Sequence, residues 1–171
     1  MSTTGGRRAA FLDRDGVLCR RAPSHDYVKS PDAFTWLAGA REGVRRLNDE
    51  GWLVLVVTNQ RGVARGLMSA GDVDAIHARA QRELAAIGAR IDAFYVCPHA
   101  DEDACACRKP APGLILRAAR EWSVDLGASF LIGDDERDVE AAHRAGVRAH
   151  RMPTDGCLSR ELERLLRHPS R

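Results

Sequence analysis

The 171-residue chain has few aromatic residues and no long hydrophobic run. Aromatic residues make up 5% of the sequence, so we expect a core built mainly from Val, Leu, Ile and Ala. No apolar run approaches the roughly 18 residues that a membrane span requires. Residues 1–8 are small, polar and basic, and no apolar segment of signal-peptide length follows them. These absences predict a flexible start over residues 1–8, a cytoplasmic location and no membrane partner.

A strong charge of either sign is also lacking. The chain has 26 basic and 24 acidic residues, which gives a formal net charge of +2. This balance does not favour a nucleic-acid partner, because such proteins usually carry a basic stripe. Only Lys29 and Lys109 are lysines, and all other basic residues are arginines. We expect a monomer that binds a small molecule.

Short apolar runs alternate with helix-like patterns along the whole chain, whose length predicts a single domain over residues 1–171. Five runs are expected to form strands: 9–12, 52–57, 91–96, 130–132 and 147–152. Helices are expected over 40–47, 73–87, 114–122, 139–145 and 158–166. Ser69 and Asp72 have the spacing of a capping box at the start of the second helix. The alternation predicts an α/β fold with a doubly wound, mostly parallel sheet.

Ligands of such sheets bind beyond the carboxyl ends of the strands. Polar residues follow four of the expected strands, over 13–16, 58–60, 97–99 and 133–135. Asp13 and Asp15 are two positions apart on an extended backbone, so both can face one pocket. With Asp134 and Asp138 they would repel one another unless a hard cation such as Mg²⁺ lies between them. For any single Asp, a helix cap or a turn is an equally good explanation. Arg14 is expected to point away from its neighbours Asp13 and Asp15.

Three cysteines and one histidine lie within eleven positions: Cys97, His99, Cys105 and Cys107. Three thiols and one imidazole suit a closed, tetrahedral and therefore structural Zn²⁺ site. The alternatives are cysteines without a metal or, less favoured by the CxC spacing, a redox pair. The acidic residues 101–103 inside this loop are expected to be solvated. Cys19 and Cys157 are expected to pack, and the other histidines, His168 included, have no ligand-like companions.

Four ordered motifs resemble those of the haloacid dehalogenase (HAD) superfamily of phosphatases: Phe-Leu-Asp-Arg-Asp-Gly-Val, Val-Val-Thr-Asn-Gln, Arg-Lys-Pro and Ile-Gly-Asp-Asp-Glu-Arg-Asp. The resemblance implies that Asp13 is the nucleophile that forms an aspartyl-phosphate. It implies that Asp15 is the general acid and then the general base. Thr58 would hydrogen-bond the phosphoryl group, and Lys109 would bind phosphate and hold the Asp13 carboxylate.

The same resemblance implies a catalytic Mg²⁺ bound by Asp13, Asp134 and the backbone carbonyl of Asp15. Asp138 matches the second acid of the last motif and is expected to lie behind the ligands. A solvated surface position is the alternative for Lys109, since most lysines are exposed.

Within the superfamily, Cys-Pro-His followed by Cys-x-Cys-Arg-Lys-Pro resembles a small capless subfamily of heptose-bisphosphate and histidinol phosphatases. The loops over 20–34 and 97–107 would then shape the substrate pocket. Four residues are expected to bind substrate: Asn59, Gln60, Arg65 and Arg108. The chain departs from the subfamily pattern at Asp26, where Gly is usual, and at Asp135, where Lys is frequent.

The resemblance implies removal of the 7-phosphate of a heptose 1,7-bisphosphate, a step of heptose biosynthesis. Hydrolysis of histidinol phosphate is the alternative within the same chemistry. A non-catalytic, zinc-stabilised binding domain is the alternative of another class.

Overall fold

Five parallel strands form the central sheet of the computed structural model, which describes residues 6–167. Their spatial order is β3-β2-β1-β4-β5. The strands are β1 (Ala9–Leu12), β2 (Leu53–Asn59), β3 (Ala93–Cys97), β4 (Phe130–Gly133) and β5 (Arg148–Arg151). All four neighbouring pairs are parallel, with Phe11 of β1 opposite Leu55 on one side and Leu131 on the other. The predicted α/β class with a doubly wound parallel sheet is confirmed.

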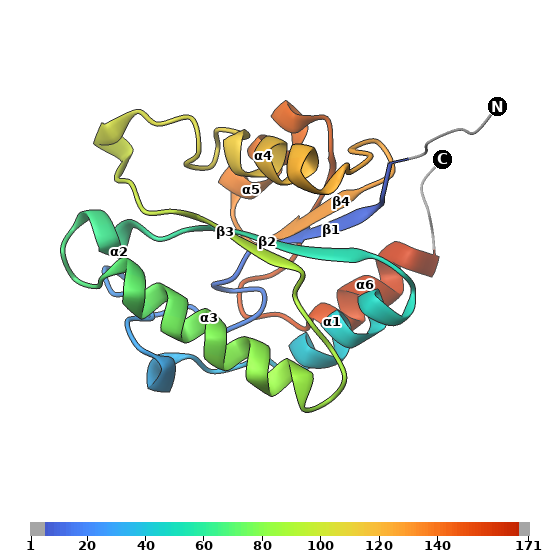
Figure 1. Ribbon diagram of the computed structural model, residues 1–171, viewed down its shortest axis with the longest axis horizontal. Coiled ribbons are helices and arrows are strands. Elements are labelled where there is room, and N and C mark those ends of the chain that lie inside the picture. Colours follow the sequence, from blue (N-terminus) through green and yellow to red (C-terminus); the bar gives the residue numbers. More distant parts are fainter. Residues whose placement is uncertain (1–5, 168–171) are drawn as a thin grey trace.

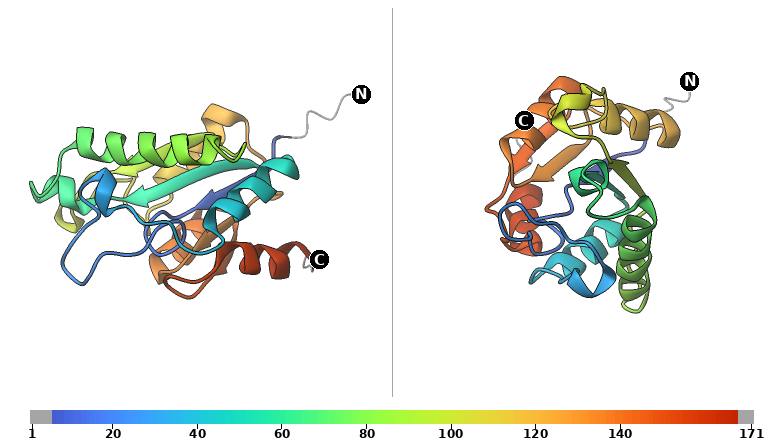
Figure 2. Two further views of the ribbon diagram at one scale, coloured as in Figure 1. Left: turned by 90° about the horizontal axis from the view of Figure 1, so that it is seen from below. Right: turned by 90° about the vertical axis from the view of Figure 1, so that its left-hand side faces the viewer.

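Helices cover both faces of this sheet (Figures 1 and 2). α4 (Gly113–Trp122) and α5 (Glu136–Ala145) lie on one face. α1 (Ala40–Asp49), α3 (Ala70–Ala85) and α6 (Leu158–Arg167) lie on the other. Side chains of β1 alternate between the two layers: Phe11 packs with the α4 and α5 residues, and Leu12 packs with those of α1 and α6. Strands buried on both faces read as continuous apolar runs, which explains why the sequence located them.

Helix ends follow local capping chemistry. Ser69 and Asp72 form the predicted capping box of α3. α5 begins three residues before its predicted start because the Asp135 side chain caps it, and its first turn is charged and carries no apolar signal. Three short elements were not expected from the sequence: α2 (Arg61–Ala64) and the 3-10 turns η1 (Pro31–Ala33) and η2 (Asp101–Asp103).

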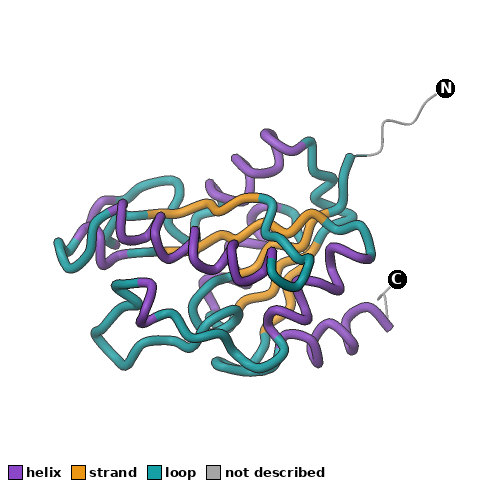
Figure 3. Tube along the Cα trace, turned by 60° about the horizontal axis from the view of Figure 1, so that its bottom comes forward, coloured by secondary structure: helices purple, strands orange, loops and turns teal. Residues whose placement is uncertain are grey.

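Long loops extend beyond one end of the strands (Figure 3). Between Gly16 and β2, the described chain forms a loop, η1 and α1. The loop packs through Cys19, Val28 and Phe34 against α3. No helix among residues 6–167 is both long and apolar enough to cross a membrane.

Part of the segment expected to be flexible lies within the described chain. The backbone of Arg7 bonds to those of Ser123 and Asp125, so this part of residues 1–8 is anchored beside the chain that follows α4. The rest of that prediction concerns residues 1–5, which lie outside the described residues, as does the prediction for His168.

Candidate active site

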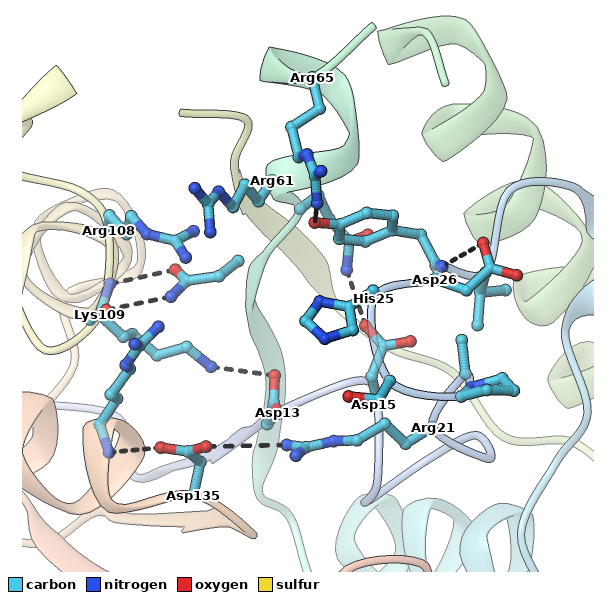
Figure 4. Close-up of a pocket in the computed structure, with 18 of the residues that line it drawn as sticks. Asp13, Asp15, Arg21, His25, Asp26, Arg61, Arg65, Arg108, Lys109 and Asp135 are labelled. Atoms are coloured by element: carbon cyan, nitrogen blue, oxygen red, sulfur yellow. Dashed lines mark hydrogen bonds and ion pairs between the residues drawn. The ribbon is translucent and has the colours of Figure 1, made fainter. Parts of the chain in front are cut away.

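A pocket of about 560 Å³ opens beyond the carboxyl ends of β1 and β2 (Figure 4). Its walls come from the loop after β1, from β2 and α2, from the segment after β3 and from the start of α5. The lining includes Asp13, Asp15, Asn59, Lys109 and Asp138. Residues of the four sequence motifs therefore meet in one place, although 125 positions separate Asp13 from Asp138.

An acidic cluster of Asp13, Asp134 and Asp138 lies at the base of the site. Each carboxylate offers an oxygen within 4.8 Å of the others, and all three residues are buried. Lys109 reaches this acidic cluster: its Nζ lies 2.9 Å from Asp13 Oδ1 and 2.5 Å from Asp138 Oδ1. The ammonium also donates to the carbonyl of Val57 at the end of β2, 2.8 Å away. A solvated position for Lys109 is therefore wrong.

The side chain of Asn59 fixes the backbone at Lys109. Its Oδ1 accepts from the Lys109 amide at 3.0 Å, and its Nδ2 donates to the Lys109 carbonyl at 3.1 Å. The end of β2 and the segment that carries Lys109 are thereby joined at a fixed register.

Burial decides the electrostatics of the acidic cluster. It raises the pKa of Asp13 to about 7, although the charge of Lys109 opposes this rise. Burial alone would lower the pKa of Lys109, but Asp13 and Asp138 together raise it above its usual value, so the ammonium stays charged. Burial also raises the pKa of Asp134, against the charge of Arg21.

The acidic cluster fits a hard divalent cation. Three carboxylates face one buried ammonium, of Lys109, and one half-exposed guanidinium, of Arg21, so negative charge remains in excess in a buried place, which is costly without a further cation. Asp134 Oδ2 is buried, and the Nη2 atom of the half-exposed Arg21 lies 3.0 Å from it. Gly16 makes room for this carboxylate: its φ is +90°, and a Cβ there would lie 2.2 Å from Asp134 Oδ2.

Asp15 lies in the same pocket but has separate partners. Arg14 is 1% exposed, and its Nη2 lies 3.1 Å from Asp15 Oδ1. The expectation that Arg14 points away from its neighbours is therefore wrong, because a buried guanidinium needs a nearby anion, and Asp15 supplies it. Burial raises the pKa of Asp15, but the charge of Arg14 and the hydrogen bonds from Arg14, Gln60 and Cys19 together hold the pKa below its usual value.

Gln60 links Asp15 to Thr58. Its Nε2 donates to Asp15 Oδ2 and to Thr58 Oγ1, each at 2.8 Å, and its Oε1 accepts from Arg14. Thr58 is fully buried, and its hydroxyl proton remains available for donation. Asn59 and Gln60, two of the four predicted substrate-binding residues, line the pocket. Their side-chain amides form hydrogen bonds with neighbouring side chains and backbone.

The other two predicted substrate-binding residues, Arg65 and Arg108, also line the pocket. Arg65 reaches the hydroxyl of Tyr27 at 3.4 Å. Arg108 bonds Asp101 Oδ1 at 2.6 Å and the carbonyl of His99 at 3.2 Å. In Figure 4, Arg108 lies near Lys109 and Arg61, and Arg65 extends toward the pocket from another side.

The predicted zinc ligands Cys97, His99, Cys105 and Cys107 gather in a Cys/His cluster. Their ligand atoms lie within 4.8 Å of one another, and the Cys107 sulfur is 3.2 Å from both Cys97 Sγ and His99 Nδ1. A tetrahedral site with Zn–S bonds of about 2.3 Å requires ligand separations slightly below about 4 Å. The five cysteines, all within the described residues, form no disulfides. The Cys/His cluster thus fits the metal better than a redox pair.

The contacts of two residues at or beside the site were not expected from the sequence. Arg21 Nη2 lies 3.0 Å from Asp134, and the stretch around Arg21 matches no family motif. Asp101 is exposed to solvent, as expected, and it also lies within 4.0 Å of arginines on three separate segments. No local spacing could have revealed either contact, because the partners are distant in sequence.

Comparisons with known proteins agree with this geometry. The HAD-hydrolase-like family model matches residues 106–171. A D-glycero-beta-D-manno-heptose-1,7-bisphosphate 7-phosphatase of Bordetella bronchiseptica is 44% identical over 80% of this chain and 75% of its own. A D-glycero-alpha-D-manno-heptose-1,7-bisphosphate 7-phosphatase of Mycobacterium tuberculosis is 43% identical over 85% of this chain and 76% of its own. The crystal structure of the D,D-heptose 1,7-bisphosphate phosphatase from B. bronchiseptica with magnesium and phosphate has a TM-score of 0.83 and 35% identity, and the match covers 94% of this chain and 99% of that one.

Proposed function

The chain belongs to the heptose-1,7-bisphosphate 7-phosphatase family of HAD-like hydrolases, and we propose that it removes the 7-phosphate of heptose 1,7-bisphosphate. The observation that carries this proposal is the acidic cluster with Lys109 at the base of an arginine-lined pocket. A carboxylate nucleophile with cationic groups around it suits a phosphoryl transition state, in which negative charge spreads over the equatorial oxygens.

In the first half-reaction, Asp13 is the nucleophile. One of its carboxylate oxygens bonds to phosphorus while the bond from phosphorus to the sugar oxygen breaks. Asp15 gives a proton to that leaving oxygen. Lys109, 2.9 Å from Asp13 Oδ1, orients the carboxylate and balances the charge of the transferring group.

In the second half-reaction, Asp15 accepts a proton from a water molecule. The resulting oxygen bonds to phosphorus, and the bond from phosphorus to Asp13 breaks, which releases phosphate and restores both acids. Arg14 favours the ionised form of Asp15 that this step requires. A bound substrate brings a dianionic phosphate beside Asp15 and so raises its pKa, which favours the protonated form required in the first step.

A Mg²⁺ ion is proposed at the carboxylates of Asp13 and Asp134 and the backbone carbonyl of Asp15. Asp138 would lie behind these ligands and hold Lys109. When bound, Mg²⁺ neutralises phosphoryl oxygens and orients the transferring group.

A structural Zn²⁺ is proposed at the Cys/His cluster. Arg108 and Lys109 follow its last ligand, Cys107, directly in the sequence. A metal that fixes Cys107 therefore restricts where both cations can lie. The proposed enzyme acts as a cytoplasmic monomer on a sugar phosphate, without nucleic-acid or membrane partners.

A substrate comparison tests the function. We expect kcat/KM for heptose 1,7-bisphosphate to exceed that for histidinol phosphate by at least about a hundredfold, because only the former presents a second phosphate to the arginines of the pocket. The readout is phosphate release with Mg²⁺. The reverse ranking would assign the chain to histidinol phosphate, and no release from any phosphomonoester would favour a binding domain.

A further inference from the structure

Three arginines converge on one carboxylate at the rim of the pocket. Asp101, in η2, lies 2.6 Å from Arg108 Nε, 3.4 Å from Arg61 Nη1 and 3.8 Å from Arg137 Nη1. We call Arg61, Arg108 and Arg137 the arginine group. Its members come from α2, from the segment after the Cys/His cluster and from the first turn of α5.

The arginine group faces the pocket. All three residues line it, and Arg61 and Arg108 extend toward one another on one wall in Figure 4. Arg108 donates through Nε to Asp101 and through Nη1 to the carbonyl of His99. The Nη2 atom of Arg108 takes part in neither contact. Asp101 is not among the residues that line the pocket, so it contacts the arginine group without occupying the pocket and leaves guanidinium donors for a ligand.

The charges suit a phosphate dianion. Three guanidinium groups and one carboxylate sum to +2. Arg61 also pairs with Glu102, but the Glu102 side chain is 72% exposed, so water screens that pair. The other arginines of the pocket are separate: Arg21 pairs with Asp134, and Arg65 with the Tyr27 hydroxyl.

We propose that Asp101 is a positioning residue that gathers Arg61, Arg108 and Arg137 into a binding site for the second phosphate of a bisphosphorylated sugar. The proposal rests on the proposed function and assigns the choice of bisphosphate over monophosphate to these four side chains. Without the carboxylate, three like charges would repel one another and separate. Planar guanidinium groups bind phosphate through paired hydrogen bonds, which gives the site both affinity and orientation.

Steady-state kinetics of Arg137→Gln and Asp101→Asn test this proposal. For each variant we expect KM for heptose 1,7-bisphosphate to rise about tenfold, the equivalent of one charge-assisted hydrogen bond. We expect kcat for this substrate and KM for heptose 7-phosphate to stay unchanged. Arg144→Gln is the matched control, because Arg144 lies on the same helix and its side chain is 52% exposed, as is that of Arg137. An equal rise of KM for both substrates, or no rise, would overturn the proposal.

Calorimetry separates this proposal from the proposed function. In an Asp13→Asn background, we measure the affinities for heptose 1,7-bisphosphate and heptose 7-phosphate. Their ratio should fall about tenfold when Arg137→Gln or Asp101→Asn is added, whether or not the unaltered chain turns either sugar over. A ratio that stays constant would refute the arginine group as the second-phosphate site, even if hydrolysis is observed.

Discussion

At the residue scale, Lys109 combines stability and chemistry. Its ammonium is buried between Asp13 and Asp138, and burial shields both ion pairs from water. Breaking a buried ion pair from one side leaves uncompensated charge, which costs far more than the loss of a surface pair. The other lysine, Lys29, shows the contrast, because it pairs with Asp26 at a half-exposed position.

We expect Lys109→Met to lower the free energy of unfolding by about 3–5 kcal/mol. Lys29→Met, the matched control, should lower it by less than about 1 kcal/mol. Urea titrations of both variants in metal-free buffer measure the difference. Equal effects of the two substitutions would contradict the buried pairing of Lys109.

The substitution Asp13→Asn should reduce phosphate release by about a thousandfold or more, since an amide cannot replace the carboxylate nucleophile. Asp92→Asn is the control: the Asp92 side chain is 7% exposed but lies outside the pocket, next to Val54 of β2. Both variants are assayed at saturating Mg²⁺ and checked for folding by circular dichroism. Near-normal turnover in Asp13→Asn would remove it as the nucleophile.

The acids and the lysine of the site could be predicted from the sequence, because each belongs to a local motif. Contacts between side chains that are distant in the sequence could not be predicted. Asp13 and Asp134 follow strand ends, so the sheet topology alone brings them together, whereas the expectation for Lys109 came from its Arg-Lys-Pro motif. Arg14 and Asp101 could not be placed, because their contacts depend on side-chain directions and on loops that meet only in the folded chain.

At the element scale, the segment from β3 to α4 carries three of the four residues of the Cys/His cluster and little regular structure. It contains η2 and otherwise lacks regular structure up to α4. Its conformation therefore rests on a few side-chain contacts, whereas the inner strands β1, β2 and β4 were predictable because each contains a continuous apolar run. The same reasoning explains why α2, η1 and η2 were not predicted: elements of three or four residues are too short to show a period.

The purified chain should contain about one zinc per molecule. Cys105→Ser should lose that zinc and also lower kcat, because Lys109 follows the Cys/His cluster closely in sequence. Cys157→Ser provides the control, since Cys157 is a free cysteine outside the cluster. Metal analysis and phosphate release are measured on the same preparations. Active, freshly isolated protein without zinc would contradict the proposed structural site.

At the scale of the whole molecule, a buried histidine links stability to pH. His77 of α3 is 6% exposed and stacks on Phe94 of β3, with ring centroids 4.1 Å apart. Burial lowers its pKa from 6.5 to about 3, and the charge of Arg14 adds to this shift. The imidazole therefore stays neutral in the folded chain at a pH where it is protonated in the unfolded chain.

This difference fixes the sign of the pH dependence. Between the folded pKa of about 3 and the unfolded value of 6.5, the unfolded chain binds one more proton at His77. The contribution of His77 is thus fully present above pH 6.5 and is lost as the pH falls, by up to about 1.4 kcal/mol per pH unit. His77→Gln should make the decline of unfolding free energy between about pH 7 and about pH 5 shallower than in the unaltered chain. His143→Gln, at an exposed position of α5, should leave the decline unchanged, and an identical decline in all three proteins by urea titration would show that His77 protonates freely in the folded state.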